Sequence, residues 1–112
     1  MNHSNCLSEF ERELKILLKK YRSLSDDIKS FEKVIFAVPI GFGKNFTIMH
    51  SSEGVKVVKA RLMCKSLRNR DIRIIYAYRN EIFEFVYIEI YFKGDKDNED
   101  RERIKNYLLK IK

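Results

Sequence analysis

Residues 55–64 read Val-Lys-Val-Val-Lys-Ala-Arg-Leu-Met-Cys, and their pattern is the clearest sign of a β-sheet in the chain. Alternate side chains of an extended strand point to opposite faces. One face therefore carries two cations, Lys59 and Arg61, side by side, and the other face is apolar, with Val58 and Leu62. This period of two predicts a β-strand with one cationic and one apolar face.

The neighbouring stretches predict the rest of a sheet. Residues 72–79 read Ile-Arg-Ile-Ile-Tyr-Ala-Tyr-Arg and make a second strand. Residues 82–92 make a third strand, which is apolar on both faces except at Glu84 and Glu89, as expected for a central strand. Residues 46–50 are a candidate fourth strand. We therefore expect an antiparallel sheet of three or four strands.

The N-terminal half has a helical period instead. Apolar residues at helical spacing predict a first helix over 8–21, and Ser8-x-x-Glu11 has the pattern of a capping box. Ser25 is expected to cap a second helix, which Pro39 ends. Two such helices joined by a short turn are expected to lie antiparallel and to share one apolar face.

The C-terminal residues predict one more helix. A charged loop over residues 93–100 precedes it, and Asp97 or Asn98 can cap it. Its apolar stripe consists of Ile104, Tyr107, Leu108 and Ile111. The order of elements predicts a single α+β domain over residues 1–112, in which an N-terminal helical hairpin packs on a three- to four-stranded antiparallel sheet with a C-terminal helix.

The composition limits the class of protein. The chain has 112 residues, of which 45% are hydrophobic, which suits one domain with its own core. No apolar run approaches the roughly 18 residues of a membrane-spanning helix, and the N-terminus lacks the pattern of an export signal. Cys6 and Cys64 are too few for a disulfide framework. We therefore expect a cytoplasmic protein with no membrane partner.

The net charge of +7 is concentrated in one segment. Residues 56–79 carry eight Lys and Arg side chains against a single acid, Asp71. Such a localised positive charge suits a polyanionic partner, because contacts with phosphates release counterions. A solubilising charged surface is the alternative interpretation.

The predicted sheet gathers cations and aromatic rings. If its first two strands pair antiparallel, Lys59 and Arg61 come near Arg73 or Arg79. Seven of the fourteen aromatic residues lie within residues 76–92. Cations that hold phosphates beside rings that stack on bases are typical of RNA binding. Tyr and Phe in strands also serve for packing alone.

Known enzyme motifs are missing from the sequence. It contains no HExxH, no paired cysteine ligands and no GxSxG elbow. His50 is a candidate general base, although a lone loop histidine more often has no catalytic role. The acids within residues 95–100 are interpreted as a helix cap and solvated surface, and the Gly41-Phe42-Gly43 loop as a connector. No metal or cofactor is therefore expected.

RNA can be cut without a metal or a histidine, because its 2′-hydroxyl can attack the neighbouring phosphate. The protein must accept one proton, stabilise the extra negative charge and donate a proton to the leaving oxygen. Crowding by other cations and partial desolvation favour the neutral amine of a lysine. Lys59, with Arg61 beside it and Lys65 and Arg73 within reach, is the candidate general base.

These segments resemble the RelE/ParE superfamily of toxins from type II toxin–antitoxin systems. The likeness rests on Lys59-x-Arg61 in a strand, on Ile72-Arg73-Ile74-Ile75-Tyr76, and on the closing strand Tyr87-Ile88-Glu89-Ile90-Tyr91-Phe92-Lys93. It implies a cytoplasmic, RelE-like mRNA interferase, a ribosome-dependent endoribonuclease that cleaves mRNA and inhibits translation. It also implies a cognate antitoxin that neutralises the toxin in a hetero-oligomer.

The resemblance and the basic segment together assign the site. By resemblance the catalytic residues are Lys59, Arg61, Arg73 and Lys93. The other cations assigned to RNA binding are Lys56, Lys65, Arg68, Arg70, Arg79 and Lys96. Neither Tyr91, inside a strand, nor Tyr107, on a helix, matches the tyrosine that the family carries in its C-terminal segment.

The sequence also allows two other functions. One is a ParE-like gyrase inhibitor without catalytic activity, and the other is a basic RNA-binding module. A hydrophobic groove beside the N-terminal hairpin or the C-terminal helix is expected to accept an antitoxin helix.

Overall fold

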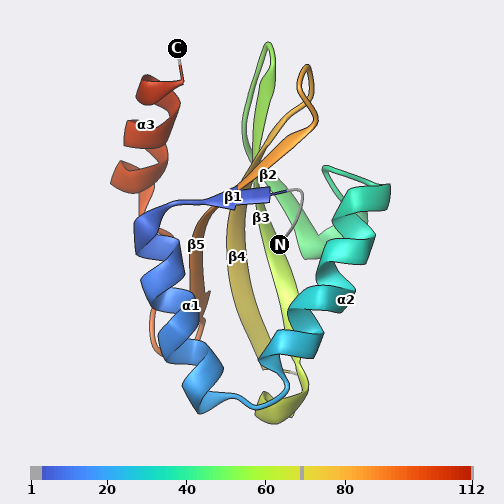
Figure 1. Ribbon diagram of the computed structural model, residues 1–112, viewed down its shortest axis with the longest axis vertical. Helices are drawn as coiled ribbons and strands as arrows, with labels where there is room; N and C mark the ends of the chain where they lie inside the picture. Colours follow the sequence, from blue (N-terminus) through green and yellow to red (C-terminus); the bar gives the residue numbers. More distant parts are fainter. Residues whose placement is uncertain (1–3, 69, 112) are drawn as a thin grey trace.

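Among the described residues, five strands form one sheet, and helices lie against both of its faces (Figure 1). The structure is a computed structural model that describes residues 4–68 and 70–111. The helical elements are α1 (Ser8–Lys20), α2 (Leu24–Ala37), the short turns η1 (Gly43–Asn45) and η2 (Lys65–Leu67), and α3 (Arg101–Lys110). The strands are β1 (Ser4–Cys6), β2 (Phe46–Ser52), β3 (Val55–Cys64), β4 (Arg70–Arg79) and β5 (Glu84–Phe92). The α+β class is confirmed.

The sheet is mixed, which corrects the prediction of a purely antiparallel sheet. Its strand order is β1-β5-β4-β3-β2, and the pairs from β5 to β2 are antiparallel. β1 runs parallel to β5, with Ser4 opposite Phe85 and Cys6 opposite Tyr87. A strand of three residues is too short to show a period in the sequence, and its pairing depends on the free edge that β5 offers.

The two faces of the sheet carry separate apolar cores. On the first face, α1 and α2 pack on residues that include Val58, Leu62 and Ile74, all fully or almost fully buried. On the second face, α3 packs through Ile104 and Tyr107 on a smaller core. The strand residues of this smaller core are Val55, Val57, Ile75, Ala77, Val86 and Ile88. The predicted apolar stripe of the last helix is thus confirmed.

A bulge in β5 changes the face of the sheet to which the side chains after Ile88 point. Ile75 of β4 pairs with Glu89, but the next residue, Tyr76, pairs with Tyr87, so Ile88 is an extra residue on β5. Tyr87 faces the first core and Ile88 the second. Without the bulge, strict alternation would turn Glu89 toward the first, helix-covered core. The bulge instead places Glu89 on the same side as α3.

α1 begins where the β1 pairing ends. The N–H of Leu7 donates to the carbonyl oxygen of Tyr87 at 2.9 Å, and the helix starts at the next residue. Ser8 therefore lies inside the helix, and its hydroxyl donates to Glu9. The predicted capping box is wrong, because a tertiary hydrogen bond sets the start of the helix.

α2 starts one residue before the predicted cap. Ser23 precedes it, and its N–H donates to the Ser66 hydroxyl at 2.8 Å. The Ser23 hydroxyl donates in turn to the buried carboxylate of Asp27 at 2.6 Å. Ser25 is exposed within the helix, so its predicted capping role is wrong. The contact with η2 fixes this boundary.

α3 is capped by Asp100 rather than by Asp97 or Asn98. The Asp100 side chain accepts a hydrogen bond from the Arg103 N–H at 3.0 Å. Its own N–H donates to the buried Glu89 carboxylate at 2.7 Å. The sheet therefore decides where this helix begins.

The two N-terminal helices run in opposite directions from a three-residue turn and diverge from it (Figure 1). Both contribute to the first core, as the predicted shared apolar face requires. None of the described helices has the length and apolar character needed to cross a membrane.

Candidate nucleic-acid interface

Three of the predicted cations share one face of the sheet. Arg61 of β3 is the direct cross-strand partner of Arg73 on β4, and Lys59 lies two residues from Arg61. Arg73 also pairs with Tyr91 on β5. We refer to Lys59, Arg61, Arg73 and Tyr91 as the cationic face.

The cationic face is open at Arg61 and partly at Lys59, whereas Arg73 and Tyr91 are buried, and α3 covers only part of this side. Towards α3, Val55 and Val57 are buried in the second core. Further along β3, Arg61 is exposed and Met63 is 54% exposed. A polyanion can therefore approach the half of the sheet that α3 leaves uncovered.

Asp71 bridges the two arginines. Its Oδ2 lies 3.1 Å from Arg73 Nη2 and 3.7 Å from Arg61 Nε. Arg73 is only 8% exposed, and its Nε has no hydrogen-bond partner in the described part of the chain. A buried N–H without an acceptor is costly.

Lys59 forms an ion pair with a buried glutamate. Its Nζ lies 2.9 Å from Glu99 Oε1, and the other carboxylate oxygen lies 3.1 Å from Arg101 Nε. Burial raises the pKa of Glu99, but the hydrogen bond and charge of Lys59, together with a backbone hydrogen bond and the charge of Arg101, lower it, and the net pKa is below its ordinary value. A carboxylate partner favours the ammonium form of a lysine, which opposes the role of general base predicted for Lys59.

The segment after β5 folds back onto the same side of the sheet. The Lys96 ammonium pairs with the fully buried Glu89, and it also lies 5.6 Å from the centre of the Tyr91 ring. Lys93 is exposed, and its Nζ donates to the carbonyl oxygen of Asp97 at 3.2 Å. Lys96 therefore borders the cationic face, whereas Lys93 contacts its own loop.

Tyr91 is the residue that sequence reasoning missed. Burial, followed by the charges of Glu99 and Glu89, raises the pKa of Tyr91 to about 12, while Arg73 acts in the opposite direction. Its phenol therefore keeps its proton at neutral pH and can donate it. The alternation of β5 could not reveal Tyr91, because the bulge at Ile88 changes its face.

The remaining predicted RNA-binding residues lie elsewhere. Lys56 is on the opposite face of β3 from Lys59, and its Nζ donates to the Ser51 hydroxyl at 2.8 Å. Arg79 lies six residues beyond Arg73 on β4, about 20 Å along an extended strand, and pairs with Glu84 at 3.5 Å. The predicted RNA-binding set therefore does not form one patch.

Of the other three cations, Lys65 and Arg68 lie in the turn between β3 and β4, and Arg70 is the first residue of β4. Lys65 is exposed, and its N–H donates to Asp27 of α2 at 3.2 Å. Arg68 is exposed and has a left-handed backbone, with φ of 56°. The Arg70 side chain lies outside the described residues. These positions lie at the end of the strands, next to the cationic face but not within it.

No protein-family model, curated protein or solved structure matches this chain. The function is therefore inferred from the geometry of the molecule.

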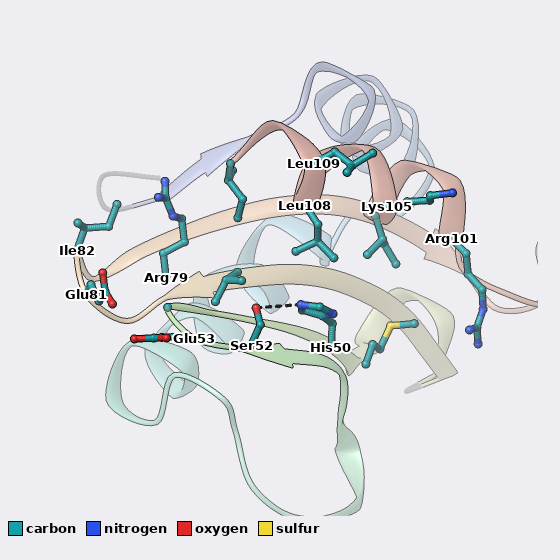
Figure 2. Close-up of a pocket in the computed structure, with 15 residues that line it drawn as sticks. His50, Ser52, Glu53, Arg79, Glu81, Ile82, Arg101, Lys105, Leu108 and Leu109 are labelled. Atoms are coloured by element: carbon teal, nitrogen blue, oxygen red, sulfur yellow. Dashed lines mark hydrogen bonds between the residues drawn. The ribbon is translucent and has the colours of Figure 1, made fainter.

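A second feature on this side is a groove of about 760 Å³ between α3 and the β2–β3 hairpin (Figure 2). Leu108 lines it from α3, and His50 and Ser52 line it from β2, joined by a hydrogen bond of 3.0 Å. Its apolar lining consists of Met49, Val55, Ile82, Ile104, Leu108, Leu109 and Ile111. Its charged lining consists of Arg79, Arg101, Lys105, Glu53 and Glu81. This lining suits an amphipathic protein segment better than a polyanion.

Metal binding finds no support in the described ranges. No group of three or more His, Cys, Asp or Glu side chains comes together there in a way that could hold an ion. The carboxylates near the cationic face are instead taken up by lysines and arginines.

Proposed function

We propose that this protein is the toxin of a type II toxin–antitoxin system and a ribosome-dependent mRNA endonuclease. The observation that supports the proposal is that Lys59, Arg61 and Arg73 lie on one face of the sheet beside Tyr91, with Arg61 exposed, Lys59 partly exposed, and Arg73 and Tyr91 buried beneath them. The resemblance to RelE-like toxins supports the same function. The target would be mRNA on the ribosome, which places the action in the cytoplasm.

The chemistry follows from the charges on this face. The 2′-oxygen of the RNA attacks the adjacent phosphorus, and the bond between phosphorus and the 5′-oxygen breaks. Arg73 and Arg61 would hold the phosphate and stabilise its extra negative charge in the transition state. The protonated phenol of Tyr91 would donate a proton to the leaving 5′-oxygen. The products are a 2′,3′-cyclic phosphate and a 5′-hydroxyl.

Primer extension on mRNA translated in vitro tests the proposal. We expect the wild-type protein to produce cuts in phase with the codons, and Arg73→Gln to lose roughly a hundredfold in rate. Lys29→Gln is the matched control, since it removes an exposed cation from α2. Equal cleavage by Arg73→Gln and Lys29→Gln would contradict the proposal.

A non-catalytic polyanion-binding function, as a gyrase inhibitor or an RNA-binding module, is the second candidate. The pairing of Lys59 with Glu99 favours it, because Glu99 occupies the amine that was predicted to act as the general base. A DNA supercoiling assay separates a gyrase inhibitor from a nuclease. Inhibited supercoiling together with intact mRNA would favour the second candidate.

The partner we propose is a cognate antitoxin that binds through an amphipathic segment. The groove beside α3 supports this, because it is apolar along Leu108 and Leu109 and has charged side chains at its rim. A helix with one apolar face fits such a groove. Bound there, the antitoxin would lie next to the cationic face and form a hetero-oligomer with the toxin.

A further inference from the structure

The ion pair between Lys59 and Glu99 joins β3 to a segment forty residues later. The Glu99 side chain is 1% exposed, whereas the Lys59 side chain is 26% exposed. The carboxylate therefore lies behind the lysine, and the ammonium lies between it and the open face. RNA cannot replace a carboxylate that it cannot reach.

Contacts made by the residues before and after Glu99 fix its position. Before it, Lys96 pairs with the buried Glu89, and after it, the Asp100 N–H donates to the same carboxylate at 2.7 Å. Arg101 occupies the second oxygen of Glu99. Because these contacts anchor the segment to the sheet, Glu99 fixes the place of the Lys59 ammonium.

We propose that Glu99 is a positioning residue that keeps Lys59 as a fixed ammonium, and that Lys59 stabilises phosphate charge during RNA cleavage instead of accepting a proton. This inference rests on the proposed function. It reverses the role of general base that the sequence predicted for Lys59. Lys59 then acts in the same way as Arg61 and Arg73.

The proton balance follows from this assignment. The 2′-hydroxyl gives its proton to a solvent hydroxide ion, which becomes water, while its oxygen bonds to phosphorus. The fixed ammonium and the two guanidinium groups stabilise the phosphorane that forms. The leaving 5′-oxygen takes its proton from Tyr91, which regains one from solvent. No further co-reactant is needed.

Substitution of Lys59 distinguishes a charge-stabilising ammonium from a general base. An arginine cannot act as a proton acceptor at neutral pH, but it can stabilise charge. We expect Lys59→Arg to keep cleavage within roughly tenfold of the wild type, and Lys59→Met to lose roughly a hundredfold or more. If Lys59→Arg is as inactive as Lys59→Met, the assignment is overturned.

A double-mutant cycle tests the part that Glu99 plays. We expect Glu99→Gln to lower kcat by roughly tenfold with little change in KM, and to add nothing further in a Lys59→Met background. Asp95→Asn is the control, because Asp95 is exposed on the same segment. Independent, additive losses from Glu99→Gln and Lys59→Met would overturn the positioning role.

A measurement without RNA keeps the inference separate from the proposed function. NMR of carbon-13-methylated lysines reports the surroundings of each amine, with Lys59→Arg identifying the signal of residue 59. We expect this signal to shift on Glu99→Gln and to stay unchanged on Asp95→Asn, because Glu99 contacts the Lys59 amine. A signal that Glu99→Gln leaves unchanged would overturn the inference. A wild-type protein that cuts no mRNA would instead refute the proposed function, and the NMR result would still decide whether Glu99 positions Lys59.

The groups that surround Lys59 in these measurements belong to three strands and the C-terminal segment. They are Arg61 on its own strand, Arg73 on β4, Glu89 and Tyr91 on β5, and Lys96, Glu99 and Arg101 beyond it.

Discussion

At the scale of single residues, Arg61 and Arg73 form an unfavourable pair. Like charges directly opposite each other on neighbouring strands destabilise a sheet. Asp71 contacts both guanidinium groups, but one carboxylate cannot neutralise two cations. The buried Nε of Arg73 has no acceptor in the described part of the chain. Natural proteins keep such locally unfavourable arrangements mainly at functional sites.

Replacing Arg73 by methionine should therefore cost function but not stability. An apolar side chain of similar length removes a buried, incompletely paired charge, and such replacements are often neutral or stabilising. We expect the free energy of unfolding of Arg73→Met, from urea denaturation, to be unchanged or higher by about 1 kcal/mol. RNA cleavage by the same variant should be lost. A large loss of stability would show that Arg73 is a structural residue.

Glu99 should make the stability of the protein depend on pH in acid. The pKa of Glu99 in the folded protein is below its ordinary value of 4.5. The ionised carboxylate therefore stabilises the fold fully above pH 4.5. This stabilisation is lost as the pH falls through the pKa that Glu99 has in the folded protein. We expect the difference in unfolding free energy between wild type and Glu99→Gln to be largest near neutral pH and to shrink below pH 4.5. Urea denaturation at several pH values measures it. A difference that stays constant down to strong acid would contradict this expectation.

At the scale of the elements, the outer edge of β5 is covered in two different ways. β1 pairs with its first half, up to Tyr87. Beyond that point, Arg103 Nη1 donates to the Ile88 carbonyl oxygen at 2.9 Å, and the Ile90 N–H donates to Glu13 at 3.3 Å. Arg103 and Glu13 also form a two-pronged ion pair at 2.9 Å. Side chains from α3 and α1 thus satisfy the edge that β1 is too short to reach.

Removal of Arg103 should loosen this edge. Arg103→Met leaves the Glu13 carboxylate and the Ile88 carbonyl oxygen without their partner, and we expect a loss of about 2 kcal/mol in unfolding free energy. Amide hydrogen exchange should become faster in the second half of β5 and in α3. Lys105→Met is the control, since Lys105 is exposed on the same helix. Equal stabilities of the two variants would contradict the role of Arg103.

At the scale of the whole molecule, the two faces of the sheet are covered unequally. Two helices cover the first face, whereas α3 covers only part of the second. The second face therefore offers both the cationic face and the groove beside α3 (Figure 2). Arg101 links them, because it lines the groove and pairs with Glu99, the partner of Lys59.

A charge in the groove should separate toxicity from neutralisation. Leu109 is 55% exposed and lines the groove, so Leu109→Glu should fold normally but bind an apolar partner segment poorly. In cells that co-express an antitoxin encoded beside this gene, we expect growth arrest with Leu109→Glu and rescue with the wild type. Ile16→Glu is the control, because Ile16 is 57% exposed on α1 and lies outside the groove lining. Rescue of both variants would show that the partner binds elsewhere.

The sequence predicted most of the elements because their periods are local. Alternation in β3 placed Lys59 and Arg61 on one face, and the helical stripes identified which sides of the three helices are buried. The sequence placed Lys59 and Arg61 near Arg73 or Arg79, and the register of β3 and β4 selects Arg73 as the partner of Arg61. By contrast, the helix caps at Ser8 and Ser25 were predicted wrongly, because hydrogen bonds to distant segments set those helix starts.

By itself, the sequence determined the α+β class, the strand that carries the cations and the apolar sides of the helices, since each depends on neighbouring residues. The tertiary structure decided the parallel pairing of β1, the bulge that turns Glu89 and Tyr91 toward the cationic face, and the pairing of Lys59 with Glu99. These features depend on contacts between residues far apart in the chain, and no local period encodes such contacts.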